Sequence, residues 1–299
     1  MQAQVKKVLR GLGNPEPPLD MRDVRELLRL DRQYYSSADT SATREVVNHL
    51  RIAGKQIIAR PTLLLDVIRK AQLSALWVPD RKRILLDAET PILKHRWYEA
   101  HEIGHSLAPW HGDFLHGDAE ETLSPTCREQ LEAEANYAAG QLIFMMERFT
   151  IEASDSTMNL ESVRQLAKRF GNTITTTLWR FVEEAHRGLP LVGIVTPSPW
   201  RAESLSDMHN STRRYCIESP SFKVRFGHVR EQQLRNIIDG YIRHRRGGPL
   251  GRADIPLLDC NGDHHLFHFE TFSNGHSLLT LGVYQQPVRL VAVPGAMRA

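Results

Sequence analysis

The stretch YEAHEIGHSLAPWH, residues 98–111, holds three histidines and two glutamates within a single short segment. Ionisable side chains are costly to bury without partners, so a cluster of this kind needs a chemical or a structural reason. Two interpretations compete. The segment is either a metal site with a base beside it, or a polar helix face that is rich in histidine.

The spacing within this stretch favours the metal site. His101 and His105 are four residues apart, so on a helix both imidazoles project from one face and can bind one ion. Glu102 completes an HExxH motif, in which the glutamate is the general base rather than a ligand. Gly104 has no side chain and would let another element approach this face closely. A catalytic zinc also needs a third protein ligand and an open fourth position.

Candidates for that ligand lie in REQLEAEANYAAGQLIF, residues 128–144. Glu129, Glu132 and Asn136 fall at i, i+3 and i+7 and therefore share one helical face. We expect Glu132 to be the third ligand, with Glu129 as the alternative. The amide of Asn136, one turn beyond Glu132, could orient a ligand by a hydrogen bond. The alanines and the glycine make this helix thin enough to pack against Gly104.

Further donors near the site would help to stabilise a tetrahedral intermediate. Tyr98, Tyr137, His111 and His116 are the candidates. Each is more simply interpreted as a surface residue, and we expect His111 and His116 to lie in the loop between the two helices, where they could border the cleft.

AHEIGH followed by EAEANYAAGQLI resembles the ImmA/IrrE metallopeptidases, and the similarity extends over about residues 60–185. The resemblance implies that His101, His105 and Glu132 bind zinc, with Glu102 as the general base; manganese or another divalent ion is the alternative. It also implies a substrate, a helix-turn-helix transcriptional repressor whose cleavage induces a stress or mobile-element response. One departure is visible: the second helix of the family usually ends in LLMP, whereas this chain reads LIFMM.

The fold class predicted is α+β, in three parts. Residues 1–154 would form a mostly helical, zincin-like peptidase domain with a small sheet, and residues 155–187 a helix-turn-helix segment. Residues 188–299 have the texture of a separate α+β domain; some members of the resembled family carry a GAF-like sensory domain there, and such a role rests on analogy alone.

Periodicity supplies more local expectations. Residues 16–60 look helical, and SALWVP with RKRILLDA reads as a hairpin. LVGIVTP, RRYCIES, FKVRFG, LLDC and VRLVAVP read as strands, interrupted by the helix REQQLRNIIDGYIRH. Asn274-Gly275 between two alternating runs is a strong hairpin signal.

Composition places the protein among globular chains. It has 299 residues, of which 41% are hydrophobic and 24% charged, with a formal charge of +3. Three cysteines without a CxxC indicate a reducing compartment. Neither a signal peptide nor a membrane span is recognisable, so we expect a cytoplasmic protein that does not contact membranes.

The segment 155–187 would expose Thr175, Thr176 and Arg180, a thin set for reading bases, so DNA binding is possible but not favoured over a packing or substrate-docking role. The chain is therefore interpreted as a zinc endopeptidase acting on a repressor. The alternatives are a non-proteolytic regulator with a structural or sensory metal, and an anti-repressor that binds its repressor without cutting it.

Overall fold

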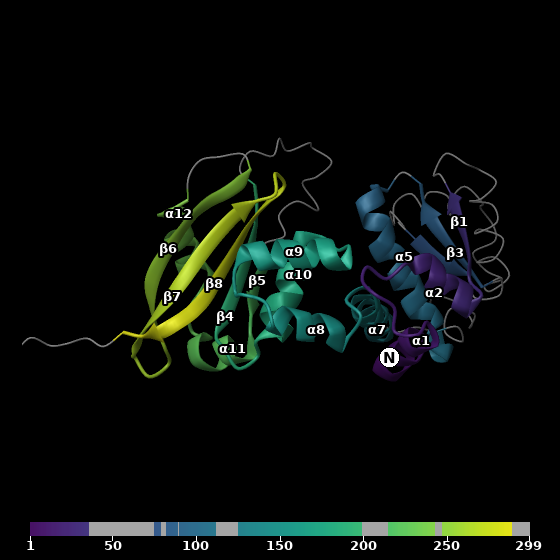
Figure 1. The fold of residues 1–299 in the computed structure, drawn as a ribbon, viewed down its shortest axis with the longest axis horizontal. Helices are drawn as coiled ribbons and strands as arrows, with labels where there is room; N and C mark the ends of the chain where they lie inside the picture. Colours follow the sequence, from purple (N-terminus) through teal and green to yellow (C-terminus); the bar gives the residue numbers. More distant parts are fainter. Residues whose placement is uncertain are drawn as a thin grey trace, which may run out of the picture. The chain divides into compact units, whose positions relative to one another are not determined.

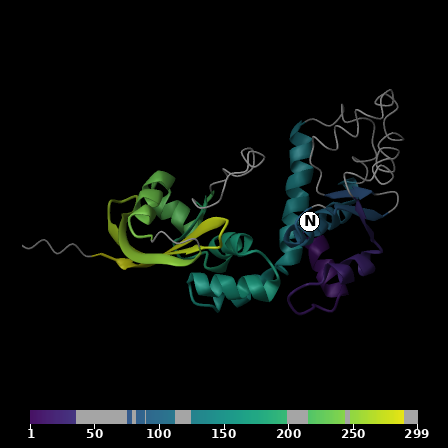
Figure 2. The ribbon, with the colours of Figure 1, turned by 90° about the horizontal axis from the view of Figure 1, so that it is seen from above.

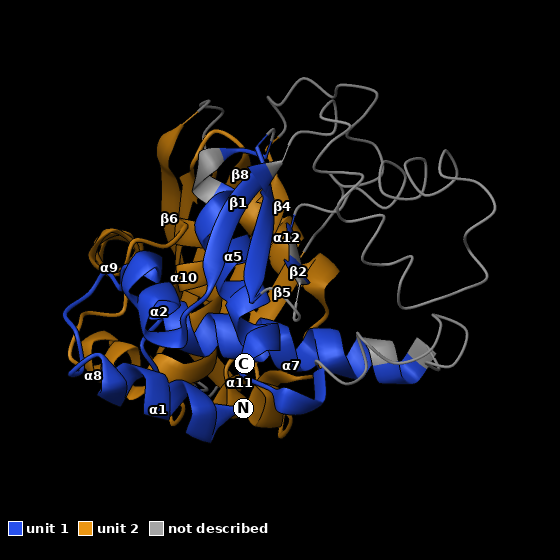
Figure 3. Cartoon of the chain, turned by 90° about the vertical axis from the view of Figure 1, so that its right-hand side faces the viewer, with its two compact units in different colours: residues 1–146 blue, residues 147–299 orange. Residues whose placement is uncertain are grey.

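The computed structural model describes residues 1–35, 75–78, 82–88, 90–111, 125–198, 215–242 and 247–288. The chain divides into two compact units, residues 1–146 and 147–299 (Figure 3). The class is α+β: a mostly helical first unit, and a second unit built on a five-stranded antiparallel sheet with helices. The three-part division at 154/155 and 187/188 stays a prediction.

The first unit combines helices with a small mixed sheet (Figure 1). Its helices are α1 (Gln2–Gly11), α2 (Met21–Leu28), α5 (Ile92–Ser106) and α7 (Pro125–Ile143). Its strands are β1 (Asp31–Tyr35), β2 (Ala75–Val78) and β3 (Arg83–Asp87), in the order β1-β3-β2. β2 pairs antiparallel with β3, which confirms the predicted hairpin. Among the described strands, β2 is therefore an edge of the sheet.

The expectation of helix throughout residues 16–60 is only partly right. α2 begins at its cap Asp20, whose side chain accepts a hydrogen bond from the Arg22 amide. The helix ends at Leu28, and its C-cap Arg29 has a left-handed conformation. β1 then pairs in parallel with β3, some fifty residues further along the chain. The remainder of the predicted helical stretch, residues 36–60, lies outside the described residues.

α5 and α7 pack against each other without an intervening side chain at Gly104. A Cβ atom on Gly104 would lie 2.7 Å from the carbonyl oxygen of Ala135 and 3.2 Å from the Cβ of Ala138. Ala135 and Ala138 are both fully buried. The predicted close approach of a thin, alanine-rich helix to Gly104 is confirmed, and it brings the histidine face of α5 beside α7.

The exit of α7 is the place where the sequence departs from LLMP. The helix ends at Ile143, and both Met145 and Met146 have positive φ angles, of 55° and 54°. Their amides donate to the carbonyls of Leu142 and Gln141, which closes the end of the helix. Buried side chains hold this turn, since both methionines are almost fully covered.

The second unit begins with helices that include the predicted helix–turn–helix. These are α8 (Glu147–Ser154), α9 (Leu160–Phe170) and α10 (Ile174–Arg180), followed by a π-helical turn, η3 (Phe181–Ala185). Gly171 takes the left-handed conformation at the end of α9, and the side chain of Thr173 caps α10. A short turn at Gly171-Asn172 therefore separates the two helices.

The sheet of this unit has the order β5-β4-β8-β7-β6, with all neighbours antiparallel. Its strands are β4 (Leu191–Pro197), β5 (Tyr215–Glu218), β6 (Gly248–Leu258), β7 (His264–Ser273) and β8 (Ser277–Pro287). The predicted hairpin is confirmed: Gly275 has a φ of 88°, and the side chain of Asn274 accepts from the amides of His276 and Ser277. VRLVAVP falls almost entirely outside the described residues.

Two helices, α11 (Pro220–Phe226) and α12 (Glu231–Asp239), cover one face of this sheet (Figure 2). The strand predicted for FKVRFG is wrong, because this segment is α11. Ser219 caps the helix and Pro220 occupies its first turn. Phe222 and Phe226, four residues apart, both pack against Phe267 in the core.

No helix among the described residues is long and apolar enough to cross a membrane.

Candidate metal centre

Three side chains from two helices meet in the first unit. His101 and His105 come from successive turns of α5, and Glu132 from α7. The Nε2 atoms of the two histidines are 3.2 Å apart. Glu132 places one carboxylate oxygen 3.2 Å from Nε2 of His101 and the other 3.5 Å from Nε2 of His105. The structure thus brings together the ligand set predicted from the sequence.

The spacing of these atoms fits a tetrahedral ion. Ligand atoms at about 2.0–2.1 Å from a zinc ion occupy corners that are about 3.3–3.4 Å apart. The two Nε2 atoms are 3.2 Å apart, and each oxygen of Glu132 lies within 3.5 Å of one of them, which is close to that value. Two imidazoles and one carboxylate are also a donor set that zinc accepts. These residues could therefore hold a zinc ion.

Glu102 lies beside this cluster on α5 and is almost fully buried. Burial raises its pKa; the charges of His101 and His105 and a backbone hydrogen bond from Trp77 of β2 oppose that shift but do not cancel it. A carboxylate with a raised pKa accepts a proton more readily than an exposed one. Glu102 consequently has the properties of a general base.

The charge on Glu132 is stabilised by the two histidines. Hydrogen bonds from His101 and then His105 hold the pKa of Glu132 far below its usual range. Burial alone would lower the pKa of His101, but the hydrogen bond with Glu132 and the nearby carboxylates outweigh it and raise the pKa. The half-exposed Glu132 is thus a carboxylate, as a ligand has to be.

A hydrogen bond from α7 orients His101. Its Nδ1 lies 3.0 Å from the side-chain oxygen of Asn136, so the ring can donate there and leave Nε2 free as a ligand atom. The orienting contact expected of Asn136 is confirmed.

His111 is not the surface residue that the sequence led us to expect. Its side chain is fully buried, because the chain turns back after α5 and places it against the histidine cluster. Its Nδ1 lies 2.9 Å from Nδ1 of His105, and its Nε2 lies 3.1 Å from an oxygen of Glu134. Sequence reasoning missed this pair. Two features of the sequence could have indicated it: His111 follows His105 by only six residues, and it stands next to Trp110.

Glu134 is held by more than His111. The indole of Trp110 donates to one carboxylate oxygen at 2.9 Å, and the amide of Gln130 donates to the other at 3.1 Å. The hydrogen bond from Trp110 is the largest of the effects that lower the pKa of Glu134. Its carboxylate is therefore charged and fixed in place.

Of the other sequence candidates, Glu129 is not part of the cluster: among the described residues, the group of histidine and carboxylate side chains that could hold a metal ion does not contain it. Tyr137 is exposed and Tyr98 is partly buried. His116 lies outside the described residues.

A second charged contact fixes α5 itself. Glu99 is buried one turn before Glu102 and pairs with Arg25 of α2 and, at 3.0 Å, with Arg32 of β1. Both carboxylate oxygens are thereby satisfied. The helix that carries the histidines is thus anchored to both neighbouring elements.

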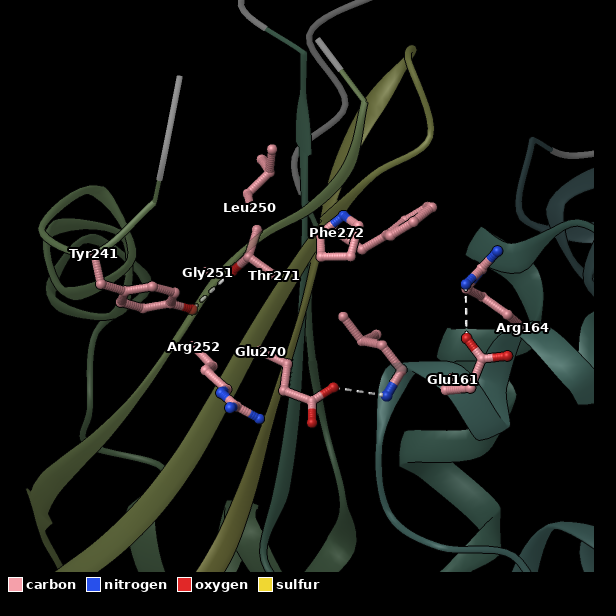
Figure 4. Close-up of a pocket in the computed structure, with 11 residues that line it drawn as sticks. Glu161, Arg164, Tyr241, Leu250, Gly251, Arg252, Glu270, Thr271 and Phe272 are labelled. Carbon is pink, nitrogen blue, oxygen red and sulfur yellow. Dashed lines mark hydrogen bonds and ion pairs between the residues drawn. The ribbon is translucent and has the colours of Figure 1, made fainter. Parts of the chain in front are cut away.

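The second unit contains a hollow of a different kind. A cavity of about 570 Å³ opens between α9 and the β6–β7 edge of the sheet (Figure 4). Arg164 lies over the ring of Phe272, at 4.9 Å from its centroid, and pairs with Glu161 at 2.6 Å. Glu270 accepts a hydrogen bond from the amide of Leu160, the first residue of α9.

Comparison with known proteins agrees with the geometry of the first unit. Residues 65–181 match the model of the peptidase M78 family, described as the IrrE N-terminal-like domain. The resemblance found in the sequence is thereby confirmed for this part of the chain. No curated protein matches. Among solved structures, a Mycobacterium tuberculosis transcriptional regulator is similar over 100% of this chain and 92% of its own, with 13% identity and a TM-score of 0.47.

Proposed function

Because residues 65–181 form an IrrE N-terminal-like domain, we propose that this protein is a zinc-dependent, site-specific endopeptidase that cleaves a helix-turn-helix transcriptional repressor. One observation carries the proposal: the cluster of His101, His105 and Glu132, with the buried Glu102 beside it. The fold of the first unit would then be zincin-like. The repressor as substrate follows from the resemblance to the ImmA/IrrE metallopeptidases.

In this reaction each residue has a separate task. His101, His105 and Glu132 would hold the ion, and Glu102 would take a proton on its carboxylate and later pass it to the leaving amine. A zinc ion in this site would lower the pKa of water to about 7 and so supply a nucleophile at neutral pH. Burial of Glu102 raises its pKa toward the range in which it can both accept and release a proton.

β2 offers a place for the substrate chain. It is an edge of the described sheet, and Trp77 within it contacts Glu102 through a backbone hydrogen bond. An extended peptide could add to such an edge through main-chain hydrogen bonds. The peptide bond to be cut would then pass close to the general base.

For the second unit we propose a regulatory, GAF-like sensory role. It is supported by the antiparallel sheet with helices and by the cavity at its β6–β7 edge. The helix–turn–helix of α9 and α10 is assigned a packing or substrate-docking role, because Arg180 is paired with Glu184 at 2.8 Å and is not free for phosphate contacts.

The test compares the wild-type chain with Glu102→Gln, which keeps the shape of the side chain and removes its basicity. Each is loaded with zinc and incubated with the helix-turn-helix repressors encoded by neighbouring genes, and fragments are identified by mass spectrometry. We expect Glu102→Gln to bind as much zinc as the wild type and to cleave roughly 10²–10⁴-fold more slowly. Glu129→Gln, an exposed glutamate outside the cluster, is the matched control and should cleave normally.

Two results would overturn the proposal. If Glu102→Gln is folded and metal-loaded and still induces the response in cells, the protein is a non-proteolytic regulator. If the wild type binds a repressor tightly and yields no fragments with zinc present, the protein acts as an anti-repressor.

A further inference from the structure

His105 is connected to the protein by a chain of two hydrogen bonds, one buried and one partly buried, that the peptidase reaction does not itself require. The chain runs from Nδ1 of His105 to Nδ1 of His111, at 2.9 Å, and from Nε2 of His111 to Glu134, at 3.1 Å. His111 is fully buried and His105 nearly so. Buried polar atoms of this kind have to be hydrogen-bonded, and here each one has a partner.

Binding of a cation decides where every proton in this chain lies. If Nε2 of His105 is a ligand atom, the neutral ring carries its proton on Nδ1 and donates it to His111. Nδ1 of His111 then has to be an acceptor, so its proton is on Nε2, from which it is donated to Glu134. The carboxylate of Glu134 accepts without a proton of its own. With the protons placed in this way, each hydrogen bond of the chain has one donor and one acceptor.

We propose that His111 and Glu134 are positioning residues that hold His105 in the tautomer and ring orientation needed for metal binding. The proposal rests on the metal site of the proposed function. Neither residue touches the position of the ion; both act through His105. A carboxylate at the end of such a chain also makes the ligand imidazole more basic and so strengthens its bond to the metal.

The contacts of Glu134 support a positioning role rather than a surface salt link. Trp110 donates to the same oxygen that faces His111, and Gln130 donates to the other, so both oxygens of the carboxylate are held. The two ligand histidines are therefore oriented by different means. His101 relies on the neutral amide of Asn136, whereas His105 relies on an imidazole that is backed by a charge.

The experiment measures zinc affinity by competition with a chelating dye in the full chain. Glu134 is the residue to change, because it is partly exposed. Replacing the fully buried His111 would also alter the packing of the core. We expect Glu134→Ala to bind zinc roughly 10–100-fold more weakly than the wild type. Glu134→Gln keeps an acceptor for His111 without the charge and should lie in between. Glu129→Gln, an exposed glutamate on the same helix, should bind zinc like the wild type.

A second measurement reads the tautomers directly. In zinc-loaded protein labelled with ¹⁵N-histidine, we expect the proton of His105 on Nδ1 and that of His111 on Nε2. In zinc-free protein, where no ion fixes the tautomers, we expect Glu134→Ala to lose the preference of His111 for the proton on Nε2 while circular dichroism stays unchanged. A merely structural role of Glu134 would alter the melting temperature and leave the tautomers as they are.

The outcomes separate the two proposals. Wild-type zinc affinity in Glu134→Ala, or His111 with its proton on Nδ1, overturns the positioning role and leaves the peptidase standing. A wild-type chain that binds no zinc overturns both. Weaker zinc binding with Glu134→Ala, together with the lost tautomer, supports the positioning role even if no repressor is cleaved.

Discussion

The metal cluster of the first unit and the cavity of the second unit differ in how their polar side chains are paired. In the cluster, Asn136 and His111 occupy the Nδ1 atoms of the two histidines, and both Nε2 atoms are left facing Glu132. In the cavity, Arg164 pairs with Glu161, and Glu270 contacts a helix amide (Figure 4). A site that is suited to bind an ion is therefore identified by lone pairs that converge on one point, and not by the size of a cavity.

Replacing one of the metal ligands should have the largest effect on zinc affinity. Glu132→Ala takes away one ligand, so we expect zinc affinity to fall by more than roughly 100-fold, beyond the loss that an orienting residue causes. Metal content after dialysis and a chelator competition would measure it. Glu129→Ala is the control. Stoichiometric zinc in Glu132→Ala, together with its loss in Glu129→Ala, would assign the ligand to Glu129 instead.

The closeness of the two helices that form the cluster can be tested at Gly104. A methyl group there would meet the backbone oxygen of Ala135 at 2.7 Å, so Gly104→Ala should lower the free energy of unfolding by about 1–3 kcal/mol. Urea denaturation measures this change. Gly140 on α7 has open space around its Cα, and Gly140→Ala should instead stabilise the helix by about 0.5–1 kcal/mol. Equal effects at both glycines would contradict the tight packing.

Substitutions at the cavity of the second unit should have the smallest effects, and these are effects on the free energy of unfolding. Arg252 is exposed, and among the described residues no hydrogen bond or ion pair holds its side chain, so Arg252→Ala should change the free energy of unfolding by less than about 0.5 kcal/mol. Glu270→Ala removes the contact with α9 and should cost about 0.5–1.5 kcal/mol. Zinc binding should be normal in both variants. A larger loss with Arg252→Ala than with Glu270→Ala would show that the arginine is engaged in the fold.

The cluster was predictable because its residues obey local spacing. HExxH fixes two histidines on one helical face, and the i, i+3, i+7 pattern put Glu132 and Asn136 on one face of the next helix. The missing side chain of Gly104 indicated that another helix could approach this face closely. The choice between Glu129 and Glu132 could not be made from periodicity alone, because both share that face; it depends on how far α7 extends along α5.

His111 could not be placed in the same way. α5 ends at Ser106, and no period relates a residue beyond a helix end to the face of the helix before it. The parallel pairing of β1 with β3 is equally invisible, since it joins segments some fifty residues apart. α11 was misread for a different reason: alternation in FKVRFG suggested a strand, although Ser219-Pro220 and the four-residue spacing of Phe222 and Phe226 already indicated a capped helix.

The edge position of β2 has a consequence for how a substrate would be selected. An edge strand binds the main chain of an extended segment, so it selects for conformation as much as for side chains. A helix-turn-helix repressor in its folded state offers helices. Its cleavage would then require local unfolding first, and the rate would follow the fraction of repressor that is open at that moment. Under the proposed function, the stability of the target would be part of the signal.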